Sequence, residues 1–164
     1  MPAAFRRILV PHDFSEHADR ALRTAAALVA SPRGTLHVLH VVTPFTPIAG
    51  LPPAEMGAYV PPADLIAAER RRLEQRVARL VRGPGAPRVV CEVVIGDPFH
   101  RILAGCRGMD VVVMATAGRS GLAHLLIGSV AEKVVRHAPI PVLTLRPGPA
   151  RGRSRGKGRG ARRR

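Results

Sequence analysis

Short apolar runs alternate along the chain with longer segments in which apolar residues recur at helical spacing. A short continuous apolar run is typical of a strand buried on both faces, and a spacing of three to four residues is typical of a helix with one buried face. The pattern predicts strands in the segments 8–10, 36–42, 88–95, 110–115 and 140–145. It predicts helices in the segments 18–29, 66–80, 98–106 and 129–137.

Strands and helices alternate in this pattern, and the connections between strands are too long for hairpins. Such an order predicts parallel strands joined by right-handed crossovers. We therefore expect an α/β fold with a single doubly wound, five-stranded parallel sheet sandwiched by helices. Ligands of such sheets bind beyond the carboxyl ends of the strands, where the strand order reverses. The loops after the first, second and fourth strands are the candidate positions.

Three helix starts carry local signals. Asp97 followed by Pro98 predicts an N-cap residue and a first helical residue. Capping boxes are predicted at 13–16 and at 129–132, where a side chain that caps a helix stands three residues before a glutamate. In both boxes the first residue is also placed to contact a ligand, and the two roles are compatible.

Composition supports this fold and separates a tail from it. Hydrophobic residues make up 46% of the chain and aromatic residues only 3%, so the core is built from aliphatic side chains, which suit a buried parallel sheet. The formal net charge is +15, and over half of it lies in Arg151–Arg164, which has eight basic residues and no acid. We predict one domain over residues 1–147 and a disordered basic tail over 148–164.

The tail has two interpretations. Arginines spaced by flexible glycines suit sequence-independent binding to nucleic acid or another polyanion, and the segment Arg151–Arg164 is the candidate for it. The alternative is an extension that only adds solubility. No segment approaches the roughly 20 apolar residues that span a bilayer, so we expect no membrane partner and a cytoplasmic location.

Metal and disulfide chemistry are not expected. Cys91 and Cys106 form no CxxC motif and fall in different predicted elements, so both thiols are expected to be reduced. His37 and His40 stand three apart on a predicted strand, which places them on opposite faces of the sheet.

The loop after the fourth predicted strand is the strongest candidate for ligand chemistry. It carries glycines at 118 and 121, and Gly128-Ser129 opens the following helix. Glycines let backbone N–H groups approach an anion, and a helix start adds unpaired amides and a positive dipole end. Phosphate binding is one interpretation of this segment, and simple turn and capping roles are the other.

This chain resembles the universal stress protein family in that segment. The family signature is Gly, two residues, Gly, nine residues, Gly and then Ser or Thr; here Gly118 and Gly128-Ser129 match, and Ala115 replaces the first glycine. The segment 8–15 is similar to the family's first strand and loop. The resemblance covers residues 5 to about 147.

The nucleotide-binding subgroup of that family implies ATP as the ligand, with or without Mg²⁺. By position, three residues lie beside the base and ribose, three line the ribose and first phosphate, and three hold the outer phosphates. In that order they are Pro11, Asp13, Val41, Met114, Ala115, Gly118, Gly128, Ser129 and Val130.

The resemblance implies a stress-response module that acts as a dimeric, ATP-responsive switch. Pro141 lacks a backbone donor, which indicates that the fifth strand lies at an edge of the sheet, and the family implies a homodimer through this strand. No G-x-x-x-x-G-K-[ST] motif occurs, and Lys133 lies one turn inside its helix, so we expect binding rather than catalysis, with slow ATP hydrolysis left open.

Two other functions remain open at this point. The first is a family member that holds no nucleotide and acts through protein contacts, which Ala115 favours. The second is a nucleic-acid-associated protein in which the domain is a scaffold for the basic tail.

Overall fold

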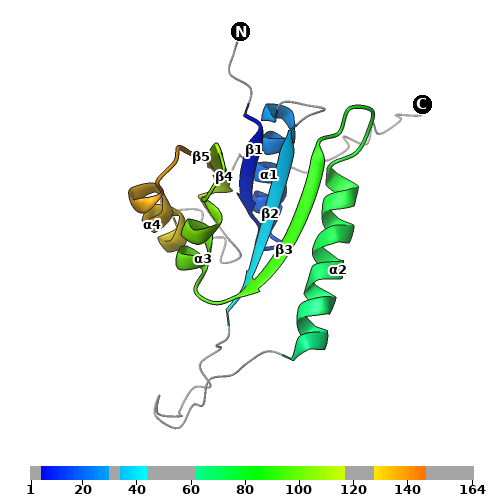
Figure 1. Cartoon of the computed structure of the whole chain (residues 1–164), viewed down its shortest axis with the longest axis horizontal. Coiled ribbons are helices and arrows are strands. Elements are labelled where there is room, and N and C mark those ends of the chain that lie inside the picture. Colours follow the sequence, from blue (N-terminus) through cyan, green and yellow to red (C-terminus); the bar gives the residue numbers. More distant parts are fainter. Residues whose placement is uncertain (1–4, 30–33, 44–61, 117–127, 147–164) are drawn as a thin grey trace, which may run out of the picture.

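The structure is a computed structural model in which residues 5–29, 34–43, 62–116 and 128–146 are described (Figure 1). Helices and strands alternate throughout these segments. Their bounds are β1 (Arg7–Pro11), α1 (Glu16–Leu28), β2 (Thr35–Val42), α2 (Ala63–Leu80), β3 (Arg88–Ile95), α3 (Pro98–Gly105), β4 (Val111–Ala115), α4 (Ser129–His137) and β5 (Val142–Leu145).

The strands form one parallel sheet with the order β3-β2-β1-β4-β5. The chain first builds outward from β1 to β3 and then returns to the other side of β1, so the strand order reverses between β1 and β4. This confirms the doubly wound α/β sheet predicted from the sequence. It also places a crevice beyond the carboxyl ends of β1 and β4, where neighbouring connections leave on opposite faces.

Alternation along the strands divides the core into two layers. Ile8 and Val10 face α1 and α2, whereas Leu9, between them, faces α3 and α4. The first layer buries Ala21, Leu22, Ala25, Val29, Leu36, Val38, Leu73, Val77, Val111 and Val113. The second buries Leu39, Ile102, Cys106, Val112, Met114, Ala131 and Val134. Helices therefore cover both faces of the sheet, as expected.

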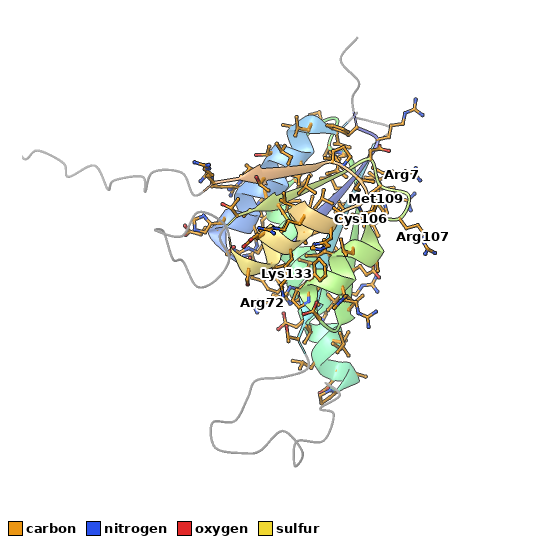
Figure 2. The ribbon with its side chains drawn as sticks, turned by 90° about the vertical axis from the view of Figure 1, so that its left-hand side faces the viewer. Arg7, Arg72, Cys106, Arg107, Met109 and Lys133 are labelled. Atoms are coloured by element: carbon orange, nitrogen blue, oxygen red, sulfur yellow. The ribbon has the colours of Figure 1, made fainter. Side chains whose placement is uncertain are left out.

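The amino ends of β1 and β4 are joined by a side chain that accepts backbone hydrogen bonds. Asp110 Oδ2 accepts from the amides of Arg6 at 2.7 Å and Arg7 at 2.8 Å, and these bonds lower the pKa of the Asp110 carboxyl. Figure 2 shows Arg7, Arg107 and Met109 gathered at this end of the molecule. The crevice lies at the opposite end of the strands.

The fifth strand is shorter than predicted but lies where predicted. It begins at Val142, because Ile140 and Pro141 form the approach to the strand, and Pro141 contributes only its carbonyl, to the amide of Val112 at 2.9 Å. Its position at the sheet edge confirms the argument from the missing donor of Pro141. The opposite edge is β3.

Two expectations fall outside the described residues: the ligand contact of Gly118 and the tail 148–164. In the part of the chain that is described, no helix is long and apolar enough to cross a membrane. Within the same residues no group of three or more His, Cys, Asp or Glu is arranged to hold a metal ion. Cys91 and Cys106 are free, and burial raises the pKa of both thiols.

Candidate functional site

A cleft of about 280 Å³ opens at the carboxyl ends of β1, β2 and β4. The start of α4 closes one side, and the loop between β1 and α1 closes the other. Its apolar lining comes from both sides of the strand reversal and includes the side chains of Leu39, Val41, Pro98, Ile102 and Met114. Such a wall suits a flat, weakly polar group that gains from leaving water.

The structure brings together eight of the nine site residues predicted from the sequence. They all line the cleft: Pro11, Asp13, Val41, Met114, Ala115, Gly128, Ser129 and Val130. The ninth, Gly118, lies outside the described residues. Residues more than 100 positions apart in the chain thus meet at one end of the sheet, as the resemblance implied.

The start of α4 offers the cleft backbone donors that have no partner in the described part of the chain. Gly128 is the N-cap and no side chain caps the helix, so the capping box predicted at 129–132 is wrong: Ser129 is already the first helical residue. The first helical hydrogen bond runs from the Glu132 amide to the Gly128 carbonyl at 2.9 Å. The amides of Ser129, Val130 and Ala131 therefore have no acceptor within the helix.

Gly128 itself has a structural part in this arrangement. Its amide donates to the carbonyl of Thr116 at 2.6 Å, so that N–H is already paired. A Cβ at this position would lie 3.0 Å from the same carbonyl oxygen, closer than side chains normally approach. Glycine thus lets the start of α4 pack directly on the end of β4.

Ala115 introduces no backbone strain at the cleft. It is the last residue of β4, in extended conformation, and the one non-glycine residue with positive φ in the described segments is Phe14. The φ of Ala115 is therefore one that any residue adopts. Its methyl group forms part of the cleft wall, next to Met114.

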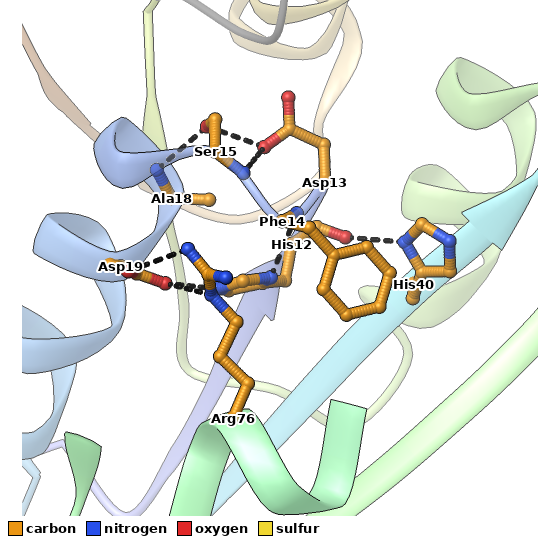
Figure 3. A network of polar contacts seen from close by, with 8 residues as sticks. All are labelled: His12, Asp13, Phe14, Ser15, Ala18, Asp19, His40 and Arg76. Atoms are coloured by element: carbon orange, nitrogen blue, oxygen red, sulfur yellow. Dashed lines mark hydrogen bonds and ion pairs between the residues drawn. The ribbon is translucent and has the colours of Figure 1, made fainter. Parts of the chain in front are cut away.

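One carboxylate oxygen of Asp13 accepts hydrogen bonds from its own loop, and the other is left available. Asp13 Oδ1 accepts from the Ser15 amide at 3.0 Å and from Ser15 Oγ at 2.6 Å, and Ser15 Oγ in turn accepts from the Ala18 amide at 3.1 Å. Ser15, not Asp13, is therefore the N-cap of α1, and the capping box predicted at 13–16 is wrong. Asp13 Oδ2 has no hydrogen bond to any residue that the structure describes, and Figure 3 shows it pointing away from this network.

Two histidines at this site were missed from the sequence. His12 and His40 are buried, at 3% and 8% exposed, and both border the cleft. His12 Nε2 lies 3.1 Å from Asp19 Oδ1, and His40 Nδ1 lies 2.7 Å from the His12 carbonyl oxygen (Figure 3). Desolvation lowers the pKa of His12, although the nearby Asp19 acts in the opposite direction.

The sequence held a signal for the contact between His12 and Asp19. Asp19 lies three residues before Leu22, on the apolar side of α1, and it is buried. A carboxylate in an apolar stripe requires a partner, since burial of an unpaired charge is costly. The sequence could not say which of its many basic side chains supplies that partner.

Comparison with known proteins places the chain in a family. The profile described as the universal stress protein family matches residues 4–146. A Thermus aquaticus protein named for the 3′ region of QAH/OAS sulfhydrylase is 32% identical over 144 residues, which covers 87% of this chain and 99% of the relative. It is itself called a universal stress protein.

Solved structures agree at the level of the fold. The universal stress protein UspA from Lactobacillus plantarum superposes with a TM-score of 0.68 at 27% identity, covering 88% of this chain and 99% of that one. A protein of the same family from Burkholderia pseudomallei superposes with a TM-score of 0.54 at 31% identity, covering 88% of this chain and 98% of its own.

Proposed function

The chain belongs to the universal stress protein family, and we propose that it is an adenine-nucleotide-binding module of that family, with ATP as its ligand. The observation that carries the proposal is the pairing of two chemistries in one cleft. An apolar wall with an available Asp13 oxygen stands opposite the first three amides of α4, which have no acceptor among the described residues. A nucleotide has the matching parts in the same order: a base, a ribose and a chain of phosphates.

Each part of the nucleotide has candidate partners among the described residues. The base would lie against Val41 and Met114, and Asp13 Oδ2 would accept from the ribose hydroxyls. The phosphates would lie at Ser129 and Val130, where free amides and the positive end of the α4 dipole favour an anion. Bound phosphate would accept hydrogen bonds from amides that have no acceptor within the helix.

Two members of the family support this class of ligand for the fold. One universal stress protein was crystallised in complex with cAMP, with a TM-score of 0.58 at 23% identity. A family protein from Arabidopsis thaliana was solved with AMP bound, with a TM-score of 0.54 at 16% identity. At these identities the likeness concerns the fold alone, so the proposal for this chain depends on its own cleft.

We further infer that this domain binds nucleotide without a catalytic role. Lys133 is the one lysine among the described residues. It lies on α4 one turn past the first amides of the helix, is exposed (Figure 2) and does not line the cleft.

We also infer a homodimer formed through β5. The carbonyl groups of Pro141 and Leu145 accept from the β4-side amides of Val112 and Thr116, so these two residues turn their backbone groups toward β4. By alternation the backbone groups of Val142 and Thr144 then face the open edge, where a second copy could pair.

The experiment that tests the nucleotide site substitutes Ser129. Ser129→Asp places a carboxylate where phosphate would lie, and ATP affinity should fall by about tenfold or more through charge repulsion. The same carboxylate favours the start of α4, so the melting temperature should be unchanged or slightly higher. Ser129→Asn is the matched neutral control and should bind ATP almost as wild type does.

The outcome separates the nucleotide-binding proposal from its alternative. A wild-type protein that binds no adenine nucleotide would favour a family member that acts through protein contacts alone. Equal ATP affinity of the Asp and Asn variants would remove the start of α4 from the phosphate site.

A further inference from the structure

The side chain of His12 is held at both ring nitrogens. The Phe14 amide donates to Nδ1 at 3.1 Å, so Nδ1 carries a lone pair and not a proton. The ring proton is then on Nε2, which donates to Asp19 Oδ1 at 3.1 Å. These two bonds define a neutral imidazole in a single tautomer.

Asp19 is fixed from its other side by α2. Arg76 Nε donates to Oδ1 at 2.7 Å and Arg76 Nη2 donates to Oδ2 at 2.9 Å, a bidentate pair (Figure 3). The hydrogen bond to Asp19 raises the pKa of Arg76. The two helices that cover this face of the sheet therefore hold Asp19 rigidly in front of His12.

The main chain of His12 is held by β2. Its amide donates to the Leu39 carbonyl at 2.8 Å, and its carbonyl accepts from His40 Nδ1 at 2.7 Å. Every polar atom of His12 thus has a partner in the protein. The residue is a fixed point between β1, β2 and α1.

Phe14 needs such a fixed point, because its backbone is strained. Its φ is 65°, a left-handed conformation that costs on the order of 1 kcal/mol or more for a bulky residue. Its ring contacts the Arg72 guanidinium, which lies 4.2 Å from the ring centroid, and the His40 ring, with 4.5 Å between the two centroids. The hydrogen bond from its amide to His12 Nδ1 stabilises the same conformation.

Asp13 lies between these two residues, so their geometry sets where its carboxylate points. We propose that His12 is a positioning residue for the nucleotide cleft: it accepts from the Phe14 amide and donates to Asp19, and by doing both it holds Asp13 in its place on the cleft wall. This inference depends on the proposed nucleotide site for its effect on binding. Its effect on the loop can be measured without any ligand.

Two substitutions separate the two bonds of His12. Asparagine offers an oxygen close to the position of Nδ1 but no atom that reaches Asp19, whereas glutamine offers an N–H donor close to the position of Nε2 but no acceptor for the Phe14 amide. His12→Asn therefore retains the bond to the loop, and His12→Gln retains the bond to the ion pair.

The first measurement is amide hydrogen exchange at Phe14 by NMR, in the full chain without ligand. Loss of the acceptor in His12→Gln should speed exchange by roughly fivefold to tenfold, and His12→Asn should stay close to wild type. The second measurement is ATP affinity by calorimetry. His12→Gln should weaken it by roughly tenfold and His12→Asn by about twofold or less.

Thermal stability provides the readout that a merely structural residue would not match. Because hydrogen bonds to charged groups are the stronger ones, His12→Asn should melt below His12→Gln although it binds ATP more tightly. Affinity that follows melting temperature in both variants would overturn the proposal.

The tautomer of His12 in the wild-type protein tests the two proposed hydrogen bonds of the ring even if a variant fails to fold. A long-range ¹H–¹⁵N spectrum should show a proton on Nε2 and none on Nδ1, and the reverse would overturn the proposal. Wild-type protein that binds no ATP would end the proposed function, and Phe14 exchange would still decide whether His12 holds the loop.

Discussion

The two sides of the cleft are built in opposite ways. On the β1 side, both ring nitrogens of His12, the Phe14 amide and Asp13 Oδ1 have hydrogen-bond partners within the protein, and Asp13 Oδ2 is left for a ligand. On the α4 side, the amides of Ser129, Val130 and Ala131 have no acceptor within the helix, and no side chain caps them. A wall held by internal hydrogen bonds can keep its shape without ligand, whereas amides with no acceptor in their own helix can gain a partner when an anion binds.

This difference assigns separate roles to the two sides. Substitutions on the β1 side should mainly lower the free energy of unfolding, and they should weaken nucleotide binding only by changing the shape of the cleft. Substitutions on the α4 side should change binding with little loss of stability. The predictions below test that separation, in decreasing order of effect.

Asp19→Ala should have the largest effect on stability. It leaves His12 and Arg76 without their shared partner, and breaking a mostly buried pair costs about 3 kcal/mol of unfolding free energy. Ser129→Ala on the other side should cost about 0.5 kcal/mol or less, as exposed substitutions do. Urea denaturation of both variants measures the contrast, and equal losses would contradict the separation.

The β5 edge belongs to neither side and should be separable from both. Val142→Lys combined with Thr144→Lys places like charges along the open edge, and the dimer dissociation constant should rise by about tenfold or more. Light scattering at micromolar concentration checks this, and ATP affinity should stay unchanged because neither residue lines the cleft. A monomeric wild type, or a double variant that stays dimeric, would remove β5 from the interface.

The pH dependence of stability should come from the β1 side and be the smallest of these effects. Burial lowers the pKa of His12 from 6.5, and the positive charge of Arg76 lowers it further. The negative charges of Asp19 and Asp13 act in the opposite direction but do not cancel the effect of burial. The unfolded chain then binds more protons than the folded one below pH 6.5, so the contribution of His12 is complete above that pH and is lost as the pH falls.

His12→Gln removes this contribution and should flatten the stability profile between pH 6.5 and 5. Part of the slope should remain, because burial also lowers the pKa of His37. Ser129→Asn should leave the slope unchanged. A slope that survives in full in His12→Gln would show that the His12 ring is not held neutral.

Much of the fold could be predicted from the sequence, because local periodicity defines elements that are buried on known faces. β3 and α4 begin and end at the predicted residues, and the strand that follows Pro141 lies at an edge. The two capping boxes were wrong for a local reason. A box pattern does not say which of several neighbouring residues is the last before the helix, and here Ser15 and Gly128 are the caps instead of Asp13 and Ser129.

The site was predictable only in part. Motif spacing placed Gly128 and Ser129 at the start of a helix that borders the cleft, and their role in phosphate binding stays a prediction. The network on the β1 side joins His12 and Asp19 to Arg76, which is 57 residues beyond Asp19 in the chain. Such a contact depends on how α2 packs on α1 and β3, and no local pattern encodes that packing.

The central claim is that the phosphate end of the cleft contributes binding energy that the base end does not. Calorimetric titration of the wild-type protein with ATP and, separately, with adenosine tests it most directly. Hydrogen bonds to charged oxygens at the start of α4 should make ATP bind about tenfold or more tightly than adenosine. Equal affinity for the two compounds, or no binding of ATP, would contradict the claim.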